Sequence, residues 1–447
     1  MTKRFSAWPI AACVLTAACG AGAGPGSGVV LDGGIDLRDV SYAHPDSAPP
    51  EEEGLSLFVT DSVRGEGLPC KVTVRGLRGT PTPSWSVGDQ EGRWLDAESG
   101  ALGIGQWVLM ARGRARIPLP PGEYELVVTR GMEYAALVFG PVTVRGGQSI
   151  ALRGELRRVV DTEGEIAGEF HIHSAPSGDS DVPLDQRVLS LAAEGVEVFA
   201  ASDHDVMGDF EHAIEALGMR AWVHWIRSVE LSVEGAGHFG AYPLPADTDP
   251  MNPIPHFGMT LPEVIRRARQ SAPVLQLNHP MWRDHPIGYW NVNRFDPMTG
   301  MSAMDFAGLY DAVEVWNSHT LDQSDAGYVG PDEVIDAWLA TLMLGHRTTA
   351  MGNTDTHRLA HSPPGWPRTY VRVADDRPGS VTDAMVTAGI LAGDASLTSG
   401  PFLRFTVNGA RPGQTVRSSE GRRVTVQVDV QAADWTPADR IEVYANR

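Results

Sequence analysis

The chain has 447 residues, 42% of them hydrophobic and 21% charged, and its formal net charge is -20 at pH 7. This length allows two or three domains with separate cores, and the composition is that of a loop-rich globular protein, not a disordered or fibrous one. The negative charge excludes binding to a nucleic-acid backbone, which needs a basic surface, but still allows a small anionic substrate held by metal ions.

Lysine and histidine are unevenly distributed along the chain. Lysine occurs only at Lys3 and Lys71, which excludes a P-loop lysine, a Schiff-base lysine and a lysine metal bridge from a central domain. Thirteen of the 14 histidines lie between His171 and His361, and only His44 lies outside. We therefore expect the chemistry of the protein to lie in this region.

Residues 1–19 read as a lipoprotein-type signal peptide. A basic pair is followed by an apolar run that is too short to span a bilayer, and small residues then precede Cys19. The prediction is an exported lipoprotein, periplasmic or on the cell surface at the outer membrane, whose membrane contact is a lipid anchor at Cys19. The alternative is an ordinary signal peptide and a soluble periplasmic product.

Cysteine usage limits the type of metal site. After removal of Cys13 with the signal peptide and acylation of Cys19, Cys70 would be the remaining thiol. An intramolecular disulfide and a cysteine zinc site are then both excluded, so nitrogen and oxygen atoms would have to hold any metal.

The next two segments predict a tether and a small domain. Residues 20–54 are rich in Gly, Pro, Asp and Ala and predict a flexible tether. In residues 55–160, short β-branched runs such as 71–75, 124–128 and 142–144 alternate with turn residues, which predicts an antiparallel β-sandwich. No cluster of catalytic residue types occurs there, so we interpret it as a structural or interaction module.

From residue 161 to residue 400 the pattern changes to alternating strands and helices. Thr260-Leu261-Pro262-Glu263 is typical of a helix start with a capping box, and Gly330-Pro331 opens another helix. Apolar strands at 196–200 and 273–277 lie between the helices, which favours a parallel α/β barrel or sheet. Residues 401–447 predict a short β segment, which could belong to an incomplete sandwich.

His171 and His173 lie in the segment 168–174, which reads as a strand by alternation. Residues at i and i+2 of a strand point to the same face, so both imidazoles could bind one cation. Taken alone, the motif is equally typical of two satisfied strand histidines.

Further nitrogen and carboxylate side chains follow other predicted strands. Asp203 and His204 follow strand 196–201, His279 follows strand 273–277, and Asp355 and His357 follow strand 348–352. Catalytic groups of parallel α/β folds gather at this rim. Glu230, at the end of strand 222–229, and His238 complete the set of expected ligands: His171, His173, His204, Glu230, His238, His279, Asp355 and His357.

The ligand types indicate the metal and the reaction. Imidazoles and carboxylates suit Zn, Mn or Fe, and Glu230 could bridge two cations. More than one such divalent ion would generate a metal-bound hydroxide, which predicts hydrolysis. We expect Asp203 to support a ligand without being one, and Asn317, at a strand end, to orient substrate or water.

Together with Leu119-Pro120-Pro121-Gly122-Glu123-Tyr124, the segment 129–134 and Leu397-Thr398-Ser399-Gly400-Pro401, these motifs resemble the polymerase and histidinol phosphatase (PHP) family, and within it the carbaryl-hydrolase-like (CehA/McbA) branch. The resemblance implies an α/β fold with a distorted (βα)7 barrel, preceded by a β-sandwich and followed by a short β segment.

The same resemblance implies how the ligands are shared. His171, His173, Glu230 and Asp355 would hold a first metal, and Glu230 would bridge to a second metal held by His238 and His279. Asp179, His204 and His357 would form a third site, with Asp179 where many phosphatase members carry histidine.

Two functions follow from these patterns. The leading hypothesis is a metal-dependent hydrolase that cleaves a phosphoester, a carboxyl ester or a carbamate in a small-molecule substrate. The alternative is a surface-tethered binding protein whose barrel is catalytically inert. Metal analysis separates them, because an inert barrel should not hold near-stoichiometric metal.

Overall fold

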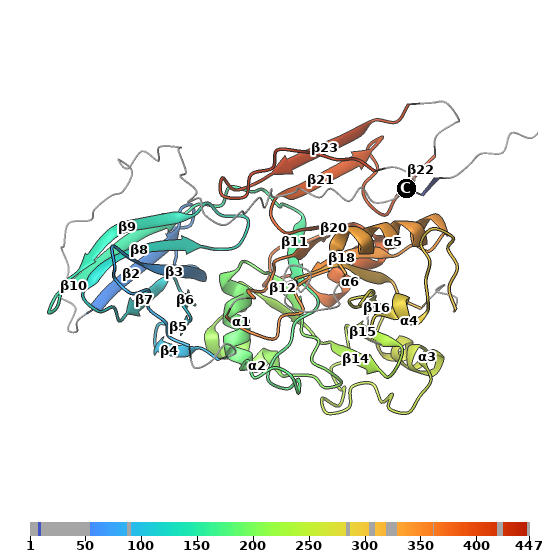
Figure 1. Cartoon of the computed structure of the whole chain (residues 1–447), viewed down its shortest axis with the longest axis horizontal. Helices are drawn as coiled ribbons and strands as arrows, with labels where there is room; N and C mark the ends of the chain where they lie inside the picture. The colour runs from blue at the N-terminus through green and yellow to red at the C-terminus, as the bar shows by residue number, and fades with distance from the viewer. Residues whose placement is uncertain are drawn as a thin grey trace, which may run out of the picture.

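The computed structural model describes residues 8–9, 54–86, 91–282, 287–303, 309–318, 329–360, 362–417 and 423–444. A β-rich part, a mixed α/β part and a C-terminal β ribbon follow one another along the chain (Figure 1). The signal peptide apart from residues 8–9, the Cys19 anchor and nearly all of the tether fall outside the described residues and stay predictions. No helix in the described part is long and apolar enough to cross a membrane.

The β-rich part consists of two sheets packed around one core. The first has the order β10-β2-β7 and the second the order β4-β5-β6-β3-β8-β9. Their bounds are β2 (Gly54–Asp61), β3 (Cys70–Leu77), β4 (Arg93–Asp96), β5 (Ala101–Ile104), β6 (Trp107–Met110), β7 (Arg114–Ile117), β8 (Gly122–Thr129), β9 (Leu137–Val144) and β10 (Ser149–Leu156).

Alternation explains the sandwich. In β3 every second residue is buried, which places Val72 and Val74 in the core and Lys71 and Thr73 on the outer face. The pairs are antiparallel as expected, with one exception, because β2 and β10 are parallel. These two strands are far apart in the sequence, so no hairpin forces them to be antiparallel.

The mixed α/β part contains two five-stranded sheets. Their orders are β13-β12-β11-β19-β20 and β14-β15-β16-β17-β18. The strands are β11 (Glu165–Glu169), β12 (Val198–Ala200), β13 (His224–Ile226), β14 (Val229–Val233), β15 (Gly237–Tyr242), β16 (Val274–Leu277), β17 (Ala312–Asn317), β18 (Thr349–Asn353), β19 (Arg368–Arg372) and β20 (Ala395–Thr398).

Six helices occur in the described residues, all of them in this part. They are α1 (Leu184–Ala193), α2 (Phe210–Leu217), α3 (Leu261–Ser271), α4 (Tyr289–Val292), α5 (Pro331–Met343) and α6 (Asp383–Ala392). The predicted start of α3 is confirmed, because the Glu263 carboxylate accepts hydrogen bonds from both the backbone nitrogen and the hydroxyl of Thr260. Gly218 ends α2 in the left-handed conformation, with φ 69°.

The two sheets depart from the expected parallel barrel. β11, β12 and β13 are parallel, as are β16, β17 and β18, but β14 with β15, β15 with β16, and β19 with both β11 and β20 are antiparallel. The reason for the first antiparallel pair is local: only residues 234–236 separate β14 from β15, and so short a connection makes a hairpin. The architecture is therefore mixed α/β.

The two sheets nevertheless meet at one end. Isolated parallel bridges join Ile172 to Thr356 and His204 to Glu230, each linking one sheet to the other. Apolar side chains from both sheets also share one core, which includes Ile166, Val198 and Met351. The bridges bring together the segments that follow β11, β12 and β18.

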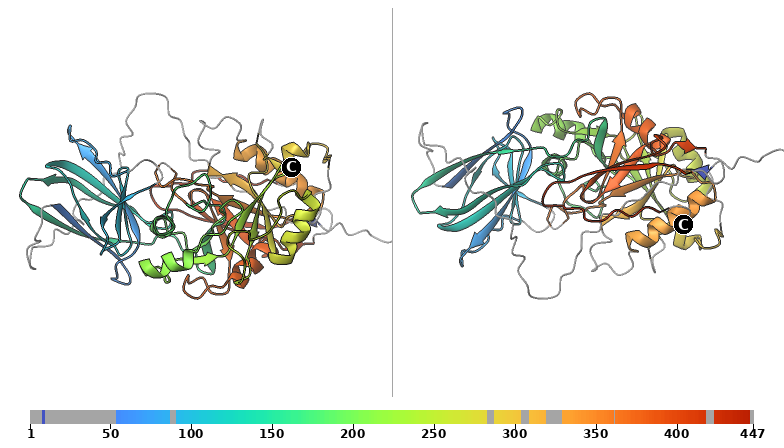
Figure 2. Two further views of the ribbon diagram at one scale, coloured as in Figure 1. Left: turned by 90° about the horizontal axis from the view of Figure 1, so that it is seen from below. Right: turned by 90° about the horizontal axis from the view of Figure 1, so that it is seen from above.

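The sandwich and the C-terminal ribbon both lie against the mixed part (Figure 1 and Figure 2). Leu102 and Leu109 of the sandwich share a core with Leu189 of α1, so the sandwich packs directly on this helix. The C-terminal ribbon of β21 (Phe402–Val407) and β23 (Val426–Gln431) lies along another side of the mixed part (Figure 2). The short strands β1 (Trp8–Pro9) and β22 (Thr415–Val416) also pair.

Candidate metal centre

The predicted ligands lie at the end of the mixed part where the two sheets meet. His171 and His173 follow β11 instead of lying within it, which corrects the expectation of a strand through residue 174. The ladder of β11 ends at Glu169, and only Ile172 makes an isolated bridge beyond it. Both imidazoles are buried and their ring centroids are 5.3 Å apart, so they face one region although they leave the strand.

The remaining ligands come from several elements. His204 follows β12, His279 follows β16, and Asp355 and His357 follow β18. Glu230 is the second residue of β14 and not the end of a strand 222–229, because that strand, β13, ends at Ile226. His238 lies near the start of β15, next to β14 in the hairpin.

Glu230 is at the centre of the cluster and its side chain is fully buried. Its Oε1 lies 3.1 Å from Nε2 of His171, 3.3 Å from Nδ1 of His238 and 3.4 Å from Nε2 of His279. Its Oε2 lies 3.4 Å from Nε2 of His173 and 3.3 Å from Nδ1 of His204. Each oxygen thus faces a different group of imidazoles, as a carboxylate shared between two cations requires.

Asp355 joins the first two histidines on another side. Its Oδ1 is 3.1 Å from Nε2 of His171 and 3.0 Å from Nε2 of His173. The backbone of Asp355 is left-handed, with φ 54°, and His279 also has a positive φ of 24°. Such conformations are unfavourable for residues other than glycine and occur preferentially at functional sites.

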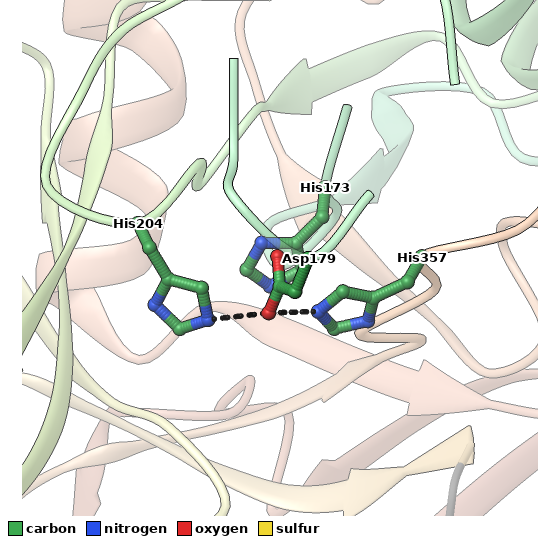
Figure 3. Close-up of side chains that lie close together, drawn as sticks. All are labelled: His173, Asp179, His204 and His357. Atoms are coloured by element: carbon green, nitrogen blue, oxygen red, sulfur yellow. Dashed lines mark hydrogen bonds and ion pairs between the residues drawn. The ribbon is translucent and has the colours of Figure 1, made fainter. Parts of the chain in front are cut away.

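Asp179 organises the outer side of the cluster (Figure 3). Its Oδ2 lies between two rings, 3.2 Å from Nε2 of His204 and 3.1 Å from Nε2 of His357. The ring of His357 stacks on that of His173, with centroids 4.0 Å apart. The structure therefore brings all nine predicted ligands into one cluster.

Four sets of donor atoms within this cluster are close enough together to hold an ion. They are His173, Asp179, His204 and His357; His171, Glu230 and His279; His171, His173 and Asp355; and His204, Glu230 and His238. The sets overlap with the division implied by the family resemblance, but they place His173 with the outer group and His204 with Glu230 as well. His171, His173, His204 and Glu230 each belong to two of the four sets.

Several buried polar atoms of the cluster lack a hydrogen-bond partner among the described residues. They include Nε2 of His171, Nε2 of His173, Oε2 of Glu230 and Nδ1 of His238. Buried polar atoms are normally satisfied, and bound divalent cations would satisfy these four. Because the donors are nitrogen and oxygen atoms only, the residues fit Zn, Mn or Fe.

Charges in the cluster stabilise one another. Burial alone would raise the pKa of Glu230, but His171, His204 and His238 hold it well below its usual value. Burial likewise opposes charge on His171, yet Asp355, Glu230 and Glu314 raise the pKa of its ring well above normal. The buried carboxylates thus stabilise positive charge within the cluster, which protons or metal ions can supply.

The pKa values of His173 and of His204, on the outer side of the cluster, are shifted in opposite directions. Burial lowers the pKa of His173 to about 3, which leaves a neutral ring. Burial also disfavours charge on His204, but Glu230 and Asp179 raise its pKa to about 9. Asp179 is 47% exposed and His204 23%, whereas His171, His173 and Glu230 are fully buried, so solvent reaches the cluster from the Asp179 side.

The two residues expected to act beside the ligands have defined partners. Asp203 accepts hydrogen bonds from the backbone and hydroxyl of Ser174, at 2.6 Å and 2.8 Å, and thereby holds the turn after His173. Asn317 is buried and its amide donates to Glu314 and to Asp355, at 3.1 Å and 3.2 Å. Both side chains thus support the ligand loops, and Asn317 directs its amide toward carboxylates instead of outward.

Sequence reasoning missed Glu314, Asn278 and Ser177. Glu314 lies 3.0 Å from Nδ1 of His171, Asn278 donates to Oε1 of Glu230 at 2.8 Å, and Ser177 donates to Asp179 at 2.7 Å. A signal existed for Glu314, because an acidic residue in the apolar run Ala312-Val313-Glu314-Val315 needs a buried partner. A signal existed for Asn278 as well, since it precedes His279 directly.

Comparisons with known proteins add little to this geometry. No protein-family model and no curated protein matches the chain. A solved structure of a "putative metal-dependent phosphoesterase" from Bifidobacterium adolescentis is similar over 51% of this chain and 96% of its own, with 15% identity and a TM-score of 0.30. Similarity at this level does not establish a shared fold or function, and the carbaryl-hydrolase-like branch stays a prediction. Fold and site define a mixed α/β protein with clustered His, Asp and Glu side chains suited to divalent metals.

Proposed function

We propose that this chain is a metal-dependent hydrolase that cleaves an ester-type bond of a small molecule, namely a phosphoester, a carboxyl ester or a carbamate. The observation that carries the proposal is the buried Glu230 carboxylate, whose two oxygens have imidazole nitrogens of His171, His173, His204, His238 and His279 within 3.4 Å. Packing alone gives no reason to bury so many uncompensated polar atoms together.

In this proposal the cluster holds two or three divalent ions. His171, His173 and Asp355 would hold one, His238 and His279 another, and Glu230 would be shared between them. Asp179, His204 and His357 would hold a third ion on the exposed side. Bound divalent ions would supply Lewis acidity, which activates water and offsets negative charge that develops during hydrolysis.

The exposure of the cluster residues sets the direction from which a substrate would approach. The outer side chains Asp179, His204 and His357 are partly exposed, whereas the Glu230 side is sealed, so a substrate would approach from the Asp179 side. Asn278 fixes the Glu230 carboxylate from behind, and Glu314 fixes the His171 ring. The reacting groups are thus prepositioned before substrate arrives.

We also propose that the mixed part is a distorted barrel of the PHP type. The two interstrand bridges that join the sheets and the core that they share support this reading. A barrel rim would collect the segments that follow β11, β12, β16 and β18, which is where the ligands lie.

Elemental analysis of the purified protein, followed by an assay with aryl phosphate, aryl acetate and aryl carbamate substrates, tests the function. We expect near-stoichiometric transition metal, turnover of at least one substrate and loss of that turnover on chelation. Glu230→Gln should abolish turnover and loosen the metal, whereas Glu98→Gln, on an exposed turn of the sandwich, should change neither.

A folded protein without transition metal would contradict the proposal and favour the surface-tethered binding protein. Turnover that survives chelation would also contradict it.

A further inference from the structure

Ser177 lies in the turn between His173 and Asp179 and is 2% exposed. Its hydroxyl oxygen is 2.7 Å from Oδ1 of Asp179, 3.2 Å from Nδ1 of His173 and 3.2 Å from the backbone nitrogen of His204. One hydroxyl thus contacts three of the four residues in the outer donor set.

The chemistry of a hydroxyl fixes the direction of each hydrogen bond. A serine hydroxyl has one hydrogen to donate and two lone pairs to accept with. The Asp179 carboxylate can only accept, so the hydrogen goes to Asp179, and the backbone N–H of His204 takes one lone pair. The other lone pair faces Nδ1 of His173, and a favourable contact there requires Nδ1 to carry a hydrogen.

This direction determines which nitrogen of His173 can bind a metal. A neutral imidazole has one N–H and one lone pair, so a hydrogen on Nδ1 leaves the lone pair on Nε2. Nε2 lies 3.0 Å from Oδ1 of Asp355 and 3.4 Å from Oε2 of Glu230, and it is among the buried atoms without a hydrogen-bond partner in the described residues. It is therefore aimed into the buried half of the metal centre.

We infer that Ser177 is a positioning residue that fixes the tautomer of His173 and the orientation of Asp179, and so couples the exposed ion site to the buried one. The inference rests on the proposed metal centre and deepens it. Groups that hold the second nitrogen of a ligating histidine set its ring orientation and its basicity. Ser177 does this for His173 and also holds the carboxylate that faces His204 and His357.

Zinc binding by the metal-stripped full-length chain tests the inference. Equilibrium dialysis against buffered free Zn²⁺, followed by elemental analysis, gives an affinity for each ion. We expect Ser177→Ala to weaken binding of at least one ion by roughly 10- to 100-fold, the range found when a partner of a ligating side chain is removed. Ser190→Ala is the matched control, because Ser190 is buried too and, among the described residues, its hydroxyl donates to a carbonyl oxygen of its own helix.

A second pair of variants separates the hydroxyl from the packing. Ser177→Thr and Ser177→Val have nearly the same shape and differ in the hydroxyl, so any cost of the added volume is common to both. We expect the threonine variant to bind zinc more tightly than the valine variant, again by roughly 10-fold or more. Equal zinc affinities of these two variants would overturn the inference even if Ser177→Ala failed to fold.

The tautomer itself can be observed. In ¹⁵N spectra of the zinc-loaded protein, the imidazole signals lost on His173→Gln identify His173, and we expect its Nδ1 to carry the hydrogen. A hydrogen on Nε2 would overturn the inference. These outcomes differ from failure of the metal centre, in which the unchanged protein itself would bind no zinc.

Discussion

Glu314 and His171 form a buried pair in which Oε1 of the carboxylate lies 3.0 Å from Nδ1 of the ring, and neither side chain is exposed. The contact places the ring hydrogen on Nδ1 and directs Nε2 toward Glu230 and Asp355, each 3.1 Å away. The same carboxylate accepts the backbone N–H of His279, at 2.7 Å. One side chain thus orients ligands that follow two different strands.

Glu314→Gln should weaken metal binding roughly 10- to 100-fold without removing a ligand. The amide has one acceptor oxygen where the carboxylate has two, so it cannot satisfy His171, His279 and Asn317 together. The measurement is equilibrium dialysis with Zn²⁺, and Glu98→Gln is the exposed control. Unchanged affinity would show that Glu314 does not orient the ligands.

Arg187→Met should lower the free energy of unfolding by about 3 kcal/mol or more, because hydrogen bonds from a charged donor contribute about 1.5–3 kcal/mol each. The buried guanidinium donates to the carbonyl oxygens of His173, Thr356 and Arg358, at 2.9 Å, 3.2 Å and 3.2 Å. Urea denaturation measures the loss. Arg220→Met, on the exposed surface, is the control, and an equal effect of the two variants would refute a special role for Arg187.

Removal of metal should lower the stability of the protein. A ligand that binds only the folded state adds about 2.7 kcal/mol for each site when its free concentration is 100 times the dissociation constant. Thermal unfolding with and without a chelator measures this difference, and metal restored in excess should reverse it. The shift should be smaller in Glu230→Gln. A melting temperature that is the same with and without the chelator would contradict the presence of bound metal.

The stability of the sandwich should fall in alkaline solution because of Cys70. Burial raises the pKa of this thiol from 9.0 to about 12, with Arg130 opposing the shift. Above pH 9 the unfolded chain loses the thiol proton while the folded chain keeps it, so the free energy of unfolding falls by about 1.4 kcal/mol per pH unit until pH 12.

Urea denaturation at several pH values checks this slope. In Cys70→Ala the slope between pH 9 and pH 12 should be flatter, whatever the absolute loss of stability from the smaller side chain. Parallel slopes for the two proteins would contradict the assignment.

Much of the candidate metal centre could be predicted from the sequence, for a simple reason. Proposed ligands such as His204, His279 and Asp355 each lie two to four residues after an apolar strand, and the carboxyl ends of neighbouring parallel strands lie together. Helix starts such as that at Thr260 were equally accessible, because capping depends on residues adjacent in the sequence.

Two features were not predicted from the sequence, for different reasons. Glu314 and His171 are separated by 143 residues, so their pairing could not be inferred from spacing. The antiparallel β14 and β15 were missed because the periodicity of buried strands does not distinguish a parallel from an antiparallel neighbour. Gly235 and Gly237, both with positive φ at this hairpin, were the available turn signal.

The packing of the sandwich against α1 makes the two parts difficult to separate. Arg130 of the sandwich donates hydrogen bonds to the carbonyl oxygens of Pro69 and Ala192, and Lys71 forms an ion pair with Glu194 just after the helix. Apolar side chains on both sides of this junction belong to a single core. Expression of the mixed part alone would therefore leave an apolar face and unpaired charges in water, and insolubility of such a fragment would say nothing about its chemistry.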